Sequence, residues 1–257
     1  MTTSSVPPRP VGSAAPVVLV LPAFDEEATV ADVVRRAPAQ VLGHPVEVVV
    51  VDDGSTDATA TRAAEAGAHV ERQGRNRGLG AAVRHGFATA VSLDPAAVAF
   101  CDADGEYAPE ELEHLVGPIL AGTADYVIGS RFSTGPRHMR PHRHLGNRAL
   151  TIGLRALARM PLTDGQSGYR ALSPAAAASA EIIHDYNYAQ VLTLDLVAKG
   201  FRYTEVPISY RFREQGTSFI RLPTYLRRVG PAVRAQLRAQ PIDRPQRIEA
   251  PATPLPS

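Results

Sequence analysis

The feature that most constrains the fold is an apolar run that ends abruptly at closely spaced carboxylates. Residues 97–101 are typical of a buried strand, and Asp102, Asp104 and Glu106 follow at alternate positions. Side chains two apart on an extended strand point to the same side, so Asp102 and Asp104 can reach one point, and a turn at Gly105 can bring Glu106 back toward it. Such carboxylates repel one another unless a hard cation lies between them. The pattern predicts a Mg²⁺ or Mn²⁺ site with positions left for phosphate oxygens.

Two further apolar runs end in the same way. Residues 46–51 lead into Asp52 and Asp53, and residues 17–21 lead into the acidic segment 22–27. The carboxyl ends of parallel strands share one edge, which is where open α/β sheets bind ligands. We therefore expect an acidic rim along that edge, although an isolated Asp-x-Asp is more often a solvated loop.

Strand and helix patterns alternate through the first half of the chain. We expect strands at 17–22, 46–52, 68–72, 97–102 and 125–129. Between them we expect helices at 29–36, 57–66 and 79–91 and a helix that begins at Pro109. This alternation predicts an α/β fold with a doubly wound, mostly parallel sheet and a Rossmann-like nucleotide-binding half.

The second half is less regular. We expect helices at 144–159 and 187–199, a strand or hairpin arm at 203–210, and a loop at 133–144. The tails 1–15 and 241–257 lack periodicity and are expected to be disordered, which leaves one domain over residues 16–220. We expect residues 221–240 to form an amphipathic helical element with one apolar and one arginine-rich face. It could pack on the core or lie on an anionic membrane surface.

Charge is distributed unevenly, although the net charge is only +1. Residues 1–130 carry 8 arginines and 18 acidic residues, whereas residues 131–257 carry 19 basic and 8 acidic residues. The first half could therefore hold a cation and the second half anions. The predominance of arginine suits bidentate phosphate recognition, although a GC-rich genome would give the same ratio.

The composition also bounds partners and compartment. Cys101 is the single cysteine, so an internal disulfide is excluded. We find no apolar span of about 18 residues and no signal-peptide pattern. We expect a cytoplasmic protein that can work at the inner face of the membrane. The basic half lacks interleaved aromatics, so no nucleic-acid partner is expected.

Seven motifs in order carry a family resemblance. They are LPAFDE (21–26), VDDGSTD (51–57), NRGLG (76–80), DADGE (102–106), GSRF (129–132), DGQSGYR (164–170) and EVPI (205–208). Over residues 16–220 the chain resembles the family 2 inverting glycosyltransferases, and within them the polyprenyl (dolichyl) phosphate mannose or glucose synthases.

The resemblance implies a GT-A fold that binds a nucleotide-sugar and Mg²⁺ or Mn²⁺. It implies nucleotide-sugar contacts at Pro22, Phe24, Glu26, Val51, Asp53, Asp102, Ala103 and Arg213. It implies metal ligands at Asp102, Asp104 and Glu106. A carboxylate at Asp53 can accept N–H bonds from a uracil or guanine edge. Residues 52–55 are also suited to a turn and a helix cap.

The resemblance further places cations near the donor diphosphate and the acceptor phosphate. Arg131 and Arg143 would meet the acceptor phosphate, and Arg213 the donor. The related synthases usually carry a lysine where Phe219 stands here, and Arg221 could restore that charge.

The expected reaction moves mannose or glucose from a GDP- or UDP-sugar to a polyprenyl phosphate. The expected catalytic residues are Arg131 and Asp164. An acceptor hydroxyl would need Asp164 as a general base, whereas an anionic phosphate would not, and Asp164 would then orient the sugar or the arginines. The alternatives are transfer to a hydroxyl of a small metabolite or glycan, and a non-catalytic nucleotide-sugar-binding protein.

Overall fold

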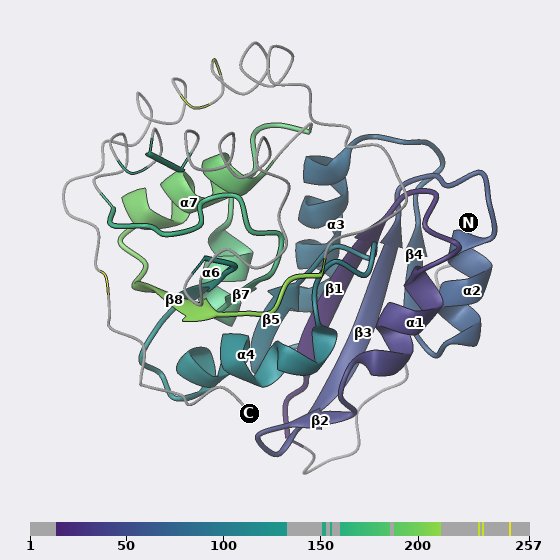
Figure 1. Ribbon diagram of the computed structural model, residues 1–257, viewed down its shortest axis with the longest axis horizontal. Helices are drawn as coiled ribbons and strands as arrows, with labels where there is room; N and C mark the ends of the chain where they lie inside the picture. Colours follow the sequence, from purple (N-terminus) through teal and green to yellow (C-terminus); the bar gives the residue numbers. More distant parts are fainter. Residues whose placement is uncertain are drawn as a thin grey trace.

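The computed structural model describes residues 14–132, 151–152, 155, 160–185, 188–211, 231, 233 and 247. Within them an eight-stranded mixed sheet forms the centre of the molecule (Figure 1). Its strands are β1 (Val17–Ala23), β2 (Gln40–Val41), β3 (His44–Asp52), β4 (His69–Arg72), β5 (Ala97–Phe100), β6 (Tyr126–Ser130), β7 (Arg170–Leu172) and β8 (Tyr203–Pro207). They follow the order β3-β1-β5-β7-β6-β8, and both β2 and β4 pair with β3.

The sheet is mostly parallel, as the sequence predicts. Strands β4, β3, β1 and β5 pair in parallel, and so do β6 and β8. Strand β7 runs antiparallel between β5 and β6 and was not predicted. Because β7 is reversed, the segment that enters it lies at the edge where the parallel strands end.

Helices cover both faces of the sheet. They are α1 (Val30–Arg36), α2 (Thr59–Glu65), α3 (Leu79–Ser92), α4 (Leu112–Leu120), α6 (Pro174–Ser179) and α7 (Ala189–Ala198), with a 3₁₀ turn at Pro109–Glu111. In Figure 1, α1 and α2 lie beside β3 and β4, whereas α6 and α7 lie beside β7 and β8.

Alternate strand residues build two separate cores. Val18 and Val20 pack with α3, α6 and α7 on one face, whereas Leu19 and Leu21 pack with α1 and α4 on the other. Helix α3 approaches β1 very closely, because a Cβ at Gly86 would lie 2.3 Å from Val20 Cγ1. Strands buried on both faces explain the continuous apolar runs of the sequence.

The expected disorder of the tails 1–15 and 241–257 stays a prediction. Two residues of these tails are described in contact with the sheet. The carbonyl of Ala15 lies 2.7 Å from His44 Nδ1, and Arg247 forms a bridge to Tyr203. Most of the tails and most of the predicted elements at 133–159 and 221–240 lie outside the described residues. Val233 is helical and packs against the core that α3, α6 and α7 form on one face of the sheet.

The domain bounds 16–220 stay a prediction. Among the described helices, none combines the length and the apolar character that a membrane crossing requires.

Candidate functional site

Hydrogen bonds join the loops after β1 and β3 at the carboxyl edge of the sheet. Asp25, with a positive φ of 51°, donates its N–H to Ser55 Oγ at 3.0 Å. Its carboxylate accepts the N–H of Thr56 at 2.8 Å. The N–H of Glu26 reaches Thr59 Oγ1 at 2.8 Å. The two acidic segments therefore form one ordered surface, which is the predicted rim.

Asp53 has a structural role in this surface. Its two oxygens accept the backbone N–H groups of Arg77 and Gly78 at 2.8 and 2.7 Å. Burial raises the pKa of Asp53, and these two N–H bonds oppose that rise. A carboxylate oxygen can accept more than one bond, so these two bonds are compatible with the contact to a nucleotide base, which stays a prediction.

The other predicted nucleotide-binding residues lie on adjoining strands and loops. Pro22, Val51 and Ala103 are buried, and Phe24 is half-buried. Thr29 connects two of these loops, because its hydroxyl donates to the Ala103 carbonyl at 2.9 Å and lies 3.1 Å from Glu26 Oε2. These residue assignments stay predictions, although the fold brings their segments together.

Asp102 lies in an environment that disfavours its own charge. Burial raises its pKa well above the usual range, and the negative charges of Asp104 and Glu106 raise it further, whereas Arg131 lowers it. The carboxylate also lies against the backbone of a distant loop, because a Cβ at Gly168 would be 2.4 Å from Asp102 Oδ2. A divalent cation would offset this accumulated negative charge.

The three carboxylates are not arranged as a complete metal cage. In the parts of the chain that the structure describes, no group of three or more His, Cys, Asp or Glu side chains is placed to hold a metal ion. Glu106 accepts the hydroxyl of Tyr210 and, through its carbonyl, the N–H of Arg211 at 2.7 Å. Mg²⁺ commonly uses one or two carboxylates together with substrate phosphates. Asp102 and Asp104 fit that mode, and a ligand role for Glu106 stays a prediction.

A buried ion pair lies next to these acids. Arg131 follows β6 and binds Asp164 in bidentate fashion, with Nε–Oδ2 at 2.6 Å and Nη2–Oδ1 at 2.8 Å. The side chain of Arg131 is 6% exposed and that of Asp164 is 0% exposed. Although burial lowers the pKa of Arg131, Tyr107 and Asp164 raise it well above its usual value. The guanidinium also lies over the Tyr210 ring, 5.1 Å from its centroid.

This pair bears on the role of Asp164. Its oxygens already accept bonds from Arg131 and from the N–H of Gln166 at 3.1 Å. The geometry favours the second predicted role, in which Asp164 orients an arginine, over that of a general base. The predicted phosphate ligands Arg143 and Arg213, together with Phe219 and Arg221, lie outside the described residues.

Two further residues shape the site without having been given a role from the sequence. Arg170 is fully buried and donates to the carbonyls of Gly165 and Ser167 at 3.1 and 2.9 Å, and to that of Ala189 at 3.0 Å. It therefore holds the 164–168 loop against α7. Glu205 accepts bonds from the start of the same loop. Both residues belong to motifs noted in the sequence, which gave no indication of these contacts.

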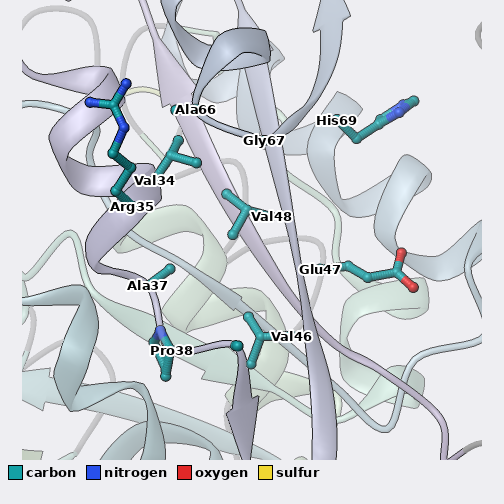
Figure 2. A pocket seen from close by; sticks show the side chains of 11 residues that line it. Val34, Arg35, Ala37, Pro38, Val46, Glu47, Val48, Ala66, Gly67 and His69 are labelled. Carbon is teal, nitrogen blue, oxygen red and sulfur yellow. The ribbon is translucent and has the colours of Figure 1, made fainter.

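A separate hollow of about 550 Å³ lies beside the first half of β3 (Figure 2). Its lining includes Val34 of α1, Val46 and Val48 of β3, and Gly67. Its lining also includes two charged residues, Arg35 of α1 and Glu47 of β3. The hollow contains none of the acids that follow β1, β3 and β5, so it is distinct from the site described above.

Comparisons with known proteins agree with the sequence resemblance. Residues 18–177 match the family described as Glycosyl transferase family 2. Polyprenol monophosphomannose synthase of Mycolicibacterium smegmatis is 30% identical over 213 residues, which span 78% of this chain and 79% of its own length. Undecaprenyl-phosphate mannosyltransferase of Micrococcus luteus is 33% identical over 67% of this chain and 74% of its own length.

A solved structure shares the fold. Glucosyl-3-phosphoglycerate synthase from Mycobacterium tuberculosis, in complex with Mn²⁺ and UDP-glucose, superimposes with a TM-score of 0.69 at 25% identity. The match covers 90% of this chain and 84% of that chain. The mixed sheet described above is therefore a GT-A fold.

Proposed function

Because this chain belongs to glycosyl transferase family 2, we propose that it transfers a hexose, mannose or glucose, from a nucleotide-sugar to a polyprenyl phosphate. The glycosyltransferase activity follows from the family. The names of two relatives support a polyprenyl phosphate as the acceptor.

The observation that carries this choice is the buried Arg131–Asp164 pair. An acceptor hydroxyl needs a base to take its proton, and Asp164 is the predicted candidate. Here the Asp164 carboxylate is buried and bound to Arg131 through both oxygens. An acceptor phosphate is already anionic near pH 7 and needs no base. The guanidinium has five N–H donors, of which the pair uses two, so Arg131 retains capacity for phosphate oxygens.

The donor side is proposed to use a divalent cation. Asp102 and Asp104 would hold Mg²⁺ or Mn²⁺ together with the donor diphosphate, as their crowded negative charge suggests. When bound, the cation would stabilise the charge that develops on the departing nucleoside diphosphate. Arg131 would add to the same stabilisation, since its charge already acts on Asp102.

A second acceptor class has its own support. The structural neighbour is named for transfer of glucose to 3-phosphoglycerate, and one of its structures contains phosphoglyceric acid. That acceptor joins a phosphate to a hydroxyl, so the phosphate-binding role of Arg131 would be shared by both candidates.

A polyprenyl acceptor would be met at a membrane surface. The arginine-rich face of residues 221–240 supports contact with anionic lipid. Sedimentation with anionic vesicles, compared with neutral vesicles, measures this contact, and equal binding to both would contradict it.

The acceptor experiment uses radiolabelled GDP-mannose and UDP-glucose with Mn²⁺. Each is incubated with undecaprenyl phosphate or with 3-phosphoglycerate, and the products are separated by solvent extraction. Label in the organic phase supports the lipid acceptor. Label found only in an aqueous glycosyl phosphoglycerate would replace it by the second candidate, and free sugar alone would exclude both.

A further inference from the structure

Glu205 holds the segment that carries Asp164. It lies on β8 beside Ile128 of β6, and its Oε1 accepts the N–H of Asp164 at 3.0 Å. The N–H of Thr163 lies 2.9 Å from both of its oxygens, and the Thr163 hydroxyl lies 3.0 Å from Oε1. All of these partners are donors, and an ionised carboxylate is the side chain that can accept from all of them at once.

The same segment is fixed from the other strand. Thr163 Oγ1 lies 2.6 Å from Ser130 Oγ, at the end of β6. The next residue, Arg131, is bound to Asp164 not only through its guanidinium but also through its backbone N–H, at 3.2 Å. The position of the guanidinium therefore depends on where the Asp164 backbone is held.

We propose that Glu205 is a positioning residue that sets the orientation of Arg131 through Thr163 and Asp164. The inference rests on the proposed function, because it takes Arg131 as the ligand of the acceptor phosphate. Glu205 touches neither substrate. It holds the backbone of Thr163 and Asp164 in place. The Asp164 carboxylate is thereby positioned to bind the Arg131 guanidinium.

The register of β6 and β8 explains why this position suits the task. Ile128 pairs with Glu205 and Ser130 with Pro207, so the carboxylate lies beside β6 shortly before the strand ends. Burial acts to raise the pKa of Glu205, and the N–H bonds from Asp164 and Thr163 oppose that rise. The charged Glu205 carboxylate is stabilised chiefly by these bonds at its buried position. Loss of the carboxylate would therefore release the backbone of Thr163 and Asp164.

The test compares Glu205→Gln with wild type. Glutamine keeps the size but offers one oxygen and a donating NH₂ group, which would face the N–H of Thr163. We expect the KM for undecaprenyl phosphate to rise about 3- to 10-fold, the effect of losing one or two hydrogen bonds, while the KM for the sugar nucleotide stays the same. Thr163→Val, which removes only the hydroxyl contacts, should give a smaller rise in the same direction.

A spectroscopic measurement tests the same inference without substrate. The Nε–H of Arg131 gives a ¹⁵N-correlated NMR signal, identified by its loss in Arg131→Lys. We expect Glu205→Gln and Thr163→Val to shift it. Asp125→Asn is the control, because it breaks a bidentate pair with Arg202 at the other end of the same strands and should leave the Arg131 signal unchanged.

The outcomes separate this inference from the proposed function. An unchanged Arg131 signal and an unchanged acceptor KM in folded Glu205→Gln would overturn the positioning role and leave the acceptor assignment intact. If wild type transferred sugar to neither acceptor, the proposed function would fail. The NMR signal would then still decide whether Glu205 positions Arg131.

Discussion

The two ends of β6 carry arginine–aspartate pairs of nearly the same geometry in very different surroundings. At the amino end, Arg202 binds Asp125 with Nε–Oδ2 at 2.8 Å and Nη2–Oδ1 at 3.1 Å. At the carboxyl end, Arg131 binds Asp164 at 2.6 and 2.8 Å. The side chains of Arg202 and Asp125 are 36% and 23% exposed. Those of Arg131 and Asp164 are 6% and 0% exposed.

The difference shows that burial, rather than geometry, determines what such a pair does. A solvent-exposed pair contributes little to stability because water and salt compete with it. A buried pair leaves an uncompensated charge when one partner is removed, and this destabilises strongly. Replacing the pair at the amino end should therefore have little effect, whereas the carboxyl end depends on its pair for structure and, under the proposed function, for phosphate binding.

The largest expected effect lies at the carboxyl end, at Asp102. Asp102→Asn should lower transfer by about 10²–10³-fold, the range seen when one charge-stabilising group is removed. Without metal its melting temperature should be equal to or higher than that of wild type, because one of three neighbouring negative charges is gone. Calorimetric titration with Mn²⁺ and scanning calorimetry test both parts. A variant with full activity in EDTA would exclude the metal role.

The second effect concerns the close approach of Gly168 to Asp102. In Gly168→Ala the new Cβ would lie 2.4 Å from Asp102 Oδ2, so the carboxylate must move. We expect activity to fall between about tenfold and 10²-fold, as displacements near reacting groups do. Gly74→Ala is the matched control, because no heavy atom lies within 4 Å of its Cβ position. Equal activity of the two variants would show that Asp102 need not occupy this position.

The third effect separates the two pairs in stability. Arg131→Met leaves Asp164 buried without its cation, and we expect a loss of about 3–5 kcal/mol in the free energy of unfolding. Arg131→Lys keeps the charge but not the bidentate contact, so its loss should be smaller. Urea denaturation measures both. If Arg131→Met were as stable as wild type, the contrast between the two ends of β6 would be lost.

The smallest effect is expected for Asp125→Asn, which should keep full activity and lose little stability. The hydrogen bonds from Arg202 lower the pKa of Asp125 below its usual 3.8. A lowered pKa means that the pair stabilises the fold above about pH 4 and that this contribution disappears as the pH falls through the pKa of the folded state. Melting curves of wild type and variant should therefore differ slightly at pH 7 and converge as the pH falls through the lowered pKa of Asp125. A difference that grows toward acid would contradict this sign.

The sequence predicted β1, β3 and β5 well, because these strands are continuous apolar runs that end at acids. The runs before Asp52 and Asp102 indicated both the strand ends and the edge that they share. Strand β7 escaped prediction because three residues, Arg170–Leu172, carry no periodicity. Its place between β5 and β6 is decided by tertiary pairing.

The sequence named candidate site residues, whose roles stay predictions, but it did not indicate their contacts. Arg131 and Asp164 were identified separately, but their pairing spans 33 positions and no local pattern reports it. The turn of Glu106 toward Tyr210 is likewise a contact between distant segments. Motif spacing indicates which side chains matter, whereas the orientation of each depends on neighbours that only the folded chain brings together.

The reversed strand β7 has a consequence for the order in which the molecule can assemble. Within the described residues β6 pairs with β7 and β8 and not with β5, so it has no sheet neighbour when it first leaves the ribosome. The three residues of β7, Arg170–Leu172, must be synthesised before β5 and β6 can be joined in one sheet. A nascent chain that stops before Arg170 would contain the paired strands β4, β3, β1 and β5, with β6 not yet paired to any of them.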